Sequence, residues 1–151
     1  YQKCLELARA AGVAKPTLYR HFRTKELLFV EALETILDKL RASVGTMARG
    51  RESAADRLRA IVAVMFTEIG RLKALIRVAE GGGARPDGAG RAVLRRGLRQ
   101  LRGDIAQVIR DGTRSGQFAE VDAELAAMVV LGGIRMAADS GSVSASWSTL
   151  V

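Results

Sequence analysis

The sequence has few of the residues that build covalent or catalytic centres. Among 151 residues there is one cysteine, Cys4, and one histidine, His21. A single cysteine excludes an intramolecular disulfide framework, and one cysteine with one histidine cannot supply the ligands of a structural zinc site. His21 also has no carboxylate partner in its own segment, and no nucleophile motif accompanies it. We therefore expect a protein that is not an enzyme and that carries no metal and no cofactor.

Long apolar runs are missing as well. Runs such as Ala60–Phe66 are far too short to cross a bilayer, and the first residues lack the apolar centre of a signal peptide. Together with the scarcity of cysteine, this predicts a cytoplasmic protein with no membrane partner.

Positive charge is plentiful and unevenly placed. The chain carries 24 Lys and Arg against 16 Asp and Glu, a net charge of +8. Six of these cations and one acid lie in residues 1–25, whereas residues 115–151 hold one Arg against four acids. A polyanion would therefore meet the N-terminal end first. A second basic block, residues 85–114, is interpreted as a solvated helix face.

The spacing of apolar residues predicts an all-α fold, because apolar positions recur every three or four residues and no alternating strand pattern is present. A long helix is expected from a Thr24 N-cap to the region of Gly45–Gly50. The next is expected to begin after Ser53–Asp56 and to be interrupted at Gly70, with a shorter helix over Leu72–Glu80. The apolar residues whose spacing predicts the first two helices are Leu33, Leu37, Leu40, Val44, Met47, Leu58, Ile61, Val62, Met65 and Ile69.

The glycine-rich segment Gly81–Gly90 predicts a break in the chain, since so many glycines with one proline do not continue a helix cheaply. No Gly-Lys-Ser/Thr sequence follows it, so it does not indicate a nucleotide loop. A further helix is expected to end at Gly112, followed by a turn at Gly116–Phe118. The last expected helix, Ala123–Ala138 with Asp122 as its cap, is apolar almost all round. It is either central in the monomer or covered on one side by another subunit.

The opening segment has the layout of a helix-turn-helix. Gly12 permits a left-handed turn after a short apolar helix, and Pro16 stands in the first turn of the next, where a missing N–H is harmless. In that second helix Leu18 and Phe22 face inward, four residues apart. The outward residues can reach phosphates or base edges of a major groove. These candidate DNA-binding residues are Lys15, Pro16, Thr17, Tyr19, Arg20, His21 and, at the start of the following helix, Lys25.

The order Leu7-Ala8-x-x-Ala11-Gly12-Val13-x-Lys15-x-Thr17-Leu18-Tyr19-x-His21-Phe22-x-x-Lys25-Glu26-x-Leu28 closely resembles the DNA-binding domain of the TetR family of transcriptional regulators. The resemblance is strong over about the first 35 residues. A weaker resemblance covers Gly116–Phe118 and the helix after it, which are similar to the turn before the family's dimerisation helices. It implies a helix-turn-helix domain over residues 1–32 and a helical effector-binding and dimerisation domain over residues 33–151. The family has a helix before this motif and a second dimerisation helix, and this sequence shows neither, so we expect both to lie in missing segments.

By this resemblance the protein is a homodimeric repressor. Its partners are a near-palindromic, double-stranded DNA operator and a small, lipophilic effector that releases the DNA. Apolar walls with one cation suit such an effector. The candidate effector-binding residues are Met65, Phe66, Ile69, Ile76, Arg77, Met128 and Met136, all of which are also compatible with ordinary core packing. The alternative function is a basic helical protein that binds nucleic acid without sequence preference and without an effector.

Overall fold

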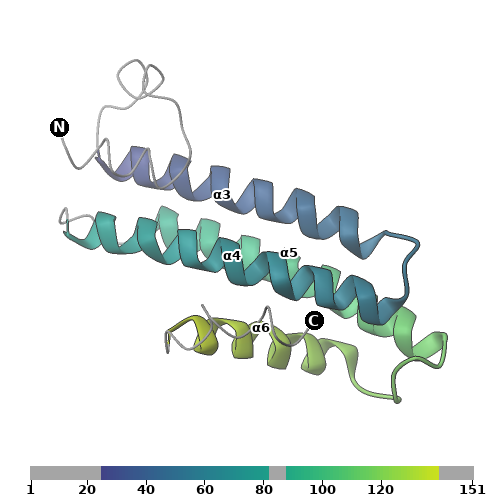
Figure 1. Cartoon of the computed structure of the whole chain (residues 1–151). Helices are drawn as coiled ribbons and strands as arrows, with labels where there is room; N and C mark the ends of the chain where they lie inside the picture. The colour runs from purple at the N-terminus through teal and green to yellow at the C-terminus, as the bar shows by residue number, and fades with distance from the viewer. Residues whose placement is uncertain (1–24, 82–87, 140–151) are drawn as a thin grey trace.

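Four helices run back and forth along one axis in the computed structural model, which describes residues 25–81 and 88–139 (Figure 1). They are α3 (Lys25–Ala48), α4 (Ala54–Gly81), α5 (Ala89–Arg114) and α6 (Ala123–Asp139). The described part of the chain contains no strand. The expected all-α fold is therefore confirmed.

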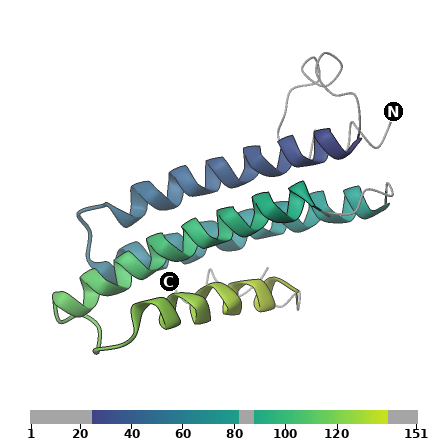
Figure 2. The ribbon, with the colours of Figure 1, turned by 180° about the vertical axis from the view of Figure 1, so that it is seen from behind.

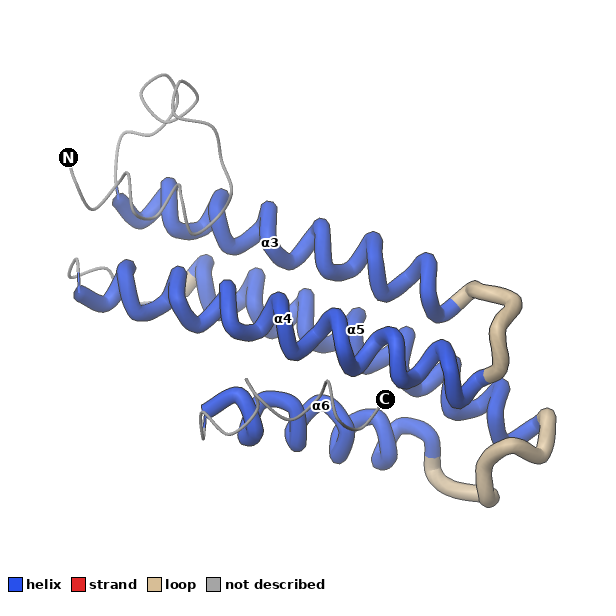
Figure 3. Tube along the Cα trace, viewed as in Figure 1, coloured by secondary structure: helices blue, strands red, loops and turns tan. Residues whose placement is uncertain are grey.

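The bundle has three layers, and this order decides which surfaces remain open. α4 and α5 form the middle layer, α3 covers one side of it, and α6 covers the other (Figures 1 and 2). The connections from α3 to α4 and from α5 to α6 lie at the same end of the bundle (Figure 3). The opposite end is the one where α3 begins, directly after the segment with the candidate DNA-binding residues.

Two apolar clusters fill the space between the helices. The first cluster joins all four helices and includes Val44, Ile61, Met65 and Ile105, each fully buried. The second cluster lies where α3 begins; in it Phe29 and Leu33 of α3 pack with Leu75 of α4. Burying side chains of this size contributes about 1.5–3 kcal/mol each, so both clusters hold α3 firmly against the middle layer.

The ends of the helices follow their capping residues. Asp122 Oδ1 accepts hydrogen bonds from the backbone N–H groups of Glu124 and Leu125, at 3.0 and 3.1 Å, as expected for the cap of α6. At the end of α5, Gly116 adopts a left-handed φ of 76°, and the Gly112 carbonyl accepts from the N–H groups of Gln117 and Phe118. The ring of Phe118 lies directly over Gly112, where a Cβ would overlap it.

Two sequence expectations need correction. Gly70 does not interrupt α4, which is one continuous helix to Gly81. Gly70 is exposed, whereas Met65, Ile69, Leu72 and Leu75 on either side are buried, so packing outweighs its unfavourable helix propensity. α5 also continues past Gly112 to Arg114. Of the two alternatives for the last helix, the central position does not hold among the described residues, since α6 lies in an outer layer of their bundle.

Within the glycine-rich segment, α4 reaches Gly81 and α5 begins at Ala89, while residues 82–87 lie outside the described residues. Among the described residues, no helix has the length and apolar character that crossing a membrane requires.

Candidate functional site

The DNA-binding candidates precede the described part of the chain. Lys15, Pro16, Thr17, Tyr19, Arg20 and His21 lie outside the described residues, and of Lys25 only the backbone is described, as the first residue of α3. Their assignment therefore stays a prediction. The structure does show the helix that comes next in the chain. This helix, α3, begins at Lys25 and extends along the whole bundle.

α3 is closely packed at its beginning. Leu28, Phe29, Ala32 and Leu33 are each at most 3% exposed and pack in the second cluster. Glu26, in the first turn, places a carboxylate at the positive end of the helix dipole. The first turns of α3 are therefore held against α4 and α5.

α3 and α5 approach each other closely at a glycine. A Cβ added to Gly97 of α5 would lie 3.0 Å from Leu37 Cδ1 of α3, so there is little room for a side chain. Beside this contact, Glu34 of α3 and Arg96 of α5 form an exposed ion pair at 3.8 Å. The missing side chain at Gly97 thus sets the distance between the two helices.

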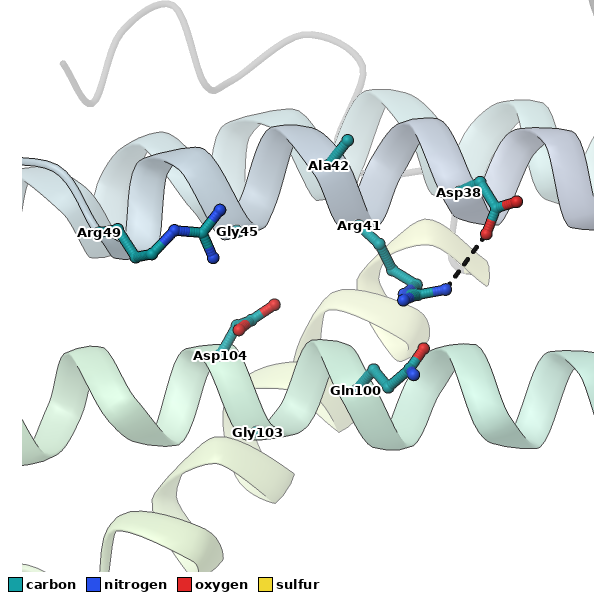
Figure 4. A pocket seen from close by; sticks show the side chains of 8 residues that line it. All are labelled: Asp38, Arg41, Ala42, Gly45, Arg49, Gln100, Gly103 and Asp104. Carbon is teal, nitrogen blue, oxygen red and sulfur yellow. Dashed lines mark hydrogen bonds and ion pairs between the residues drawn. The ribbon is translucent and has the colours of Figure 1, made fainter.

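A polar groove lies farther along the same two helices. It has a volume of about 570 Å³ and is lined by Asp38, Arg41, Ala42, Gly45, Arg49, Gln100, Gly103 and Asp104 (Figure 4). Arg41 and Asp38 form an ion pair across 3.1 Å, on the α3 side. With two arginines facing two aspartates, the groove is close to neutral and favours no anion or cation.

A second groove separates α5 from α6, and its character is different. It has a volume of about 430 Å³, and we call it the arginine groove. It is lined by Arg95, Leu98, Arg99, Arg102, Met128, Leu131, Gly132 and Arg135. The sequence analysis did not single out Arg95, Arg99 and Arg102, because residues 85–114 were interpreted as a solvated helix face. The available signal was the spacing of Arg95, Arg99 and Arg102, which lie four and three residues apart on one helix face.

The candidate effector residues are spread over core and surface. Met65 and Ile69 are buried in the first cluster, and Phe66 packs against it. Ile76 packs against the second cluster, and Arg77 is exposed on α4. Met128 lines the arginine groove, whereas Met136 is 74% exposed. The structure therefore brings Met65, Phe66 and Ile69 together but does not gather all seven around one cavity.

The outer face of α6 is apolar, and none of the described helices covers it. Leu125, Met128, Val129 and Met136 are between 47% and 74% exposed, and we call this set the α6 stripe. Met128 and Val129 lie three and four residues after Leu125, and Met136 lies seven residues after Val129, so the four share one side of the helix. Gly133, also exposed, offers open space for a neighbouring side chain. Contiguous apolar surface of this kind marks an interaction site.

Comparison with known proteins points to regulators of transcription. Residues 4–32 match the model of "Bacterial regulatory proteins, tetR family", and residues 51–139, more than half of the chain, match "Tetracyclin repressor-like, C-terminal domain". The HTH-type transcriptional activator FasR of Mycolicibacterium smegmatis is 39% identical over 61 residues. The aligned region is 40% of this chain and 28% of FasR, so it spans less than a third of that relative.

Proposed function

The chain belongs to the TetR family of transcriptional regulators, and from this premise we propose that it binds a near-palindromic operator as a homodimer and releases it when a small, lipophilic effector binds. The observation that carries the proposal is the match over residues 4–32, which includes the candidate DNA-binding residues from Lys15 to Lys25. We propose that it acts in the cytoplasm as a repressor and assign it no catalytic reaction.

Two copies are needed to read two half-sites. The α6 stripe supports a homodimer, because an isologous interface uses the same surface of each subunit and this one is apolar. Two recognition helices held about one helical turn of DNA apart, roughly 34–36 Å, would then meet successive major grooves. α6 itself is on the opposite side of the bundle from α3.

We propose α3 as the lever between effector and operator. It follows the DNA-binding segment directly and is packed along α4 and α5. An effector releases DNA only if it binds one arrangement of α3 better than the other. A cavity opened beside Met65, Phe66 and Ile69 is one candidate place for it, since these apolar side chains meet between the helices. The arginine groove is the other.

Selection from random duplex DNA tests the proposed function. We expect the full chain to enrich one sequence with two related half-sites and to bind it about 10³-fold or more tightly than random DNA at the same salt concentration. The Tyr19→Ala variant should lose most of this affinity and keep its helical circular dichroism signal. If no consensus emerges and affinity depends only on salt, the alternative of a non-specific basic protein is correct.

The direction of regulation needs its own measurement. The FasR relative is named an activator, whereas we propose repression here. A reporter behind the selected operator should be less active when the protein is present, because bound protein excludes polymerase. Higher reporter activity would instead make the protein an activator while leaving operator binding intact.

A further inference from the structure

The arginine groove holds more positive charge than the protein neutralises. Of its four arginines only Arg102 faces a carboxylate in the described part of the chain, that of Glu124 at 3.7 Å. The same Glu124 carboxylate also accepts a hydrogen bond from Arg110 at 3.2 Å, so it is shared between two cations. Arg95, Arg99 and Arg135 have no ion pair with any described residue. Three uncompensated guanidinium groups around 430 Å³ create a local field that attracts an anion.

Even the paired arginine makes no hydrogen bond through its Nε atom. This buried atom is the one that faces Glu124 Oε2 at 3.7 Å, which is too long for a hydrogen bond. A buried donor without an acceptor at hydrogen-bond distance is unfavourable, so an acceptor oxygen that came closer to this atom would be stabilised. Guanidinium groups favour carboxylate and phosphate, whose oxygens match their planar donors.

The rest of the groove is apolar. Leu98 and Leu131 contribute half-buried and buried side chains, and Met128 adds a flexible thioether. Gly132 leaves the space above α6 open, because a Cβ added there would meet no atom within 4 Å. A volume of about 430 Å³ lies within the range of small-molecule sites, roughly 300–1,000 Å³. An alkyl chain would find apolar contacts here that a bare inorganic ion would not use.

A second copy of the chain is a poor occupant for these arginines. Its α6 stripe would bring apolar side chains and another Arg135, while its Glu124 is already shared by two arginines. The three unpaired guanidinium groups would then be desolvated without a counter-charge, which is unfavourable. A small anion with an apolar part satisfies both the charge and the surface.

We infer that the arginine groove is a binding site for a small anionic amphiphile. Its carboxylate or phosphate head pairs with Arg95, Arg99 and Arg135, and its apolar part lies on Leu98, Met128 and Leu131. Met128 also belongs to the α6 stripe, so the occupant sits at the edge of the proposed dimer interface. The identification of this molecule as the effector rests on the proposed function. Its binding in the groove does not depend on that function.

Titration calorimetry of the full chain with octyl phosphate tests the binding site. We expect saturable binding that is at least tenfold weaker for inorganic phosphate, which lacks the tail, and for 1-octanol, which lacks the charge. Equal affinity for inorganic phosphate and octyl phosphate would mean an adventitious ion only and would overturn the inference. Decanoate in place of octyl phosphate distinguishes a carboxylate head from a phosphate head, and binding of either supports the site.

Two triple variants separate the groove from the overall charge. Replacement of Arg95, Arg99 and Arg135 by Gln should weaken octyl phosphate binding at least tenfold. The matched variant with Arg51→Gln, Arg59→Gln and Arg71→Gln removes the same charge from exposed arginines elsewhere and should change the affinity less than twofold. Equal losses in the two variants would overturn the inference, because attraction would then come from net charge alone.

Substitutions at two neighbouring glycines of α6 test where the apolar part of the ligand binds. Gly132 and Gly133 both face open space, but only Gly132 lines the groove. Gly132→Leu should fill the groove and abolish binding, whereas Gly133→Leu should leave the affinity within twofold. Both substitutions improve helix propensity, so neither is expected to unfold α6. Binding retained by Gly132→Leu would overturn the placement.

The effector role is measured separately, with the operator obtained by selection. Octyl phosphate should release the operator from the unaltered protein and not from the Arg95, Arg99, Arg135 variant. Binding without release would overturn the effector assignment and leave the groove as a site. If no operator can be selected, the proposed function fails, and the calorimetry still decides whether the groove binds anions.

Discussion

The guanidinium of Arg57 in α4 lies 3.2 Å from the carboxylate of Asp111 in α5. The same nitrogen, Nη1, donates a 2.6 Å hydrogen bond to the carbonyl of Ala48, the last residue of α3. One side chain therefore joins three helices, at the end of the bundle opposite the beginning of α3. The Arg57 side chain is only 11% exposed, so its charge depends on these two partners.

Asp111→Ala is expected to destabilise the fold by about 2 kcal/mol. The substitution leaves the partly buried charge of Arg57 with only a carbonyl partner, and it also removes the oxygen that accepts a hydrogen bond from Gln107. Urea denaturation followed by circular dichroism measures this change. The control is Asp38→Ala, which removes a carboxylate that is 70% exposed and should cost under about 1 kcal/mol. Equal effects of the two substitutions would mean that Arg57 finds another partner.

Contacts of this kind explain what sequence reasoning could reach and what it could not. The cap of α6 was predictable, because Asp122 acts on amides two and three residues away. The Arg57–Asp111 pair joins residues 54 positions apart, and no local pattern relates them. The same holds for the arginine groove, where spacing groups Arg95 with Arg99 but only the packing of α6 on α5 adds Arg135.

Gly70→Ala is expected to stabilise the protein by up to about 1 kcal/mol. Gly70 lies inside the continuous helix α4, is exposed, and has no atom within 4 Å of an added Cβ, so alanine gains helix propensity without a clash. Thermal denaturation should show a higher midpoint. Gly97→Ala is the control, because its Cβ would press on Leu37 Cδ1 at 3.0 Å and should cancel the gain. A lower midpoint for Gly70→Ala would instead support the helix interruption at Gly70 that the sequence predicted.

Ser53→Ala is expected to raise the pKa of Asp56. The Ser53 hydroxyl donates a 2.6 Å hydrogen bond to Asp56 Oδ2 and accepts one from the Asp56 N–H, and this hydroxyl is the main cause that lowers the pKa of Asp56, with Arg59 adding to it. NMR titration of the carboxyl carbon measures the change. Arg59→Gln, which removes the lesser cause, should raise the pKa by a smaller amount.

The lowered pKa of Asp56 also fixes the sign of the pH dependence. A carboxyl whose pKa is lower in the folded than in the unfolded state stabilises the fold above the unfolded pKa, near pH 4. This contribution is lost as the pH falls through the folded value. The difference in stability between the unaltered protein and Ser53→Ala should therefore shrink on acidification below about pH 4. A difference that grows in acid would contradict the assignment.

Val129→Asp is expected to convert the proposed dimer to a monomer. Val129 is 68% exposed at the middle of the α6 stripe, and a carboxylate there would be buried without a partner if two stripes pack together. Sedimentation velocity measures the oligomeric state of the full chain. Val121→Asp makes the same replacement at an exposed valine before α6 and should leave the dimer intact.

The Val129→Asp monomer should also bind DNA differently. A monomer meets one half-site at a time, so affinity for the full operator should fall to that for an isolated half-site, while the circular dichroism signal stays the same. If Val129→Asp remains dimeric, the interface lies on another surface. If it is monomeric yet binds the full operator as tightly as before, two linked half-sites are not the basis of recognition.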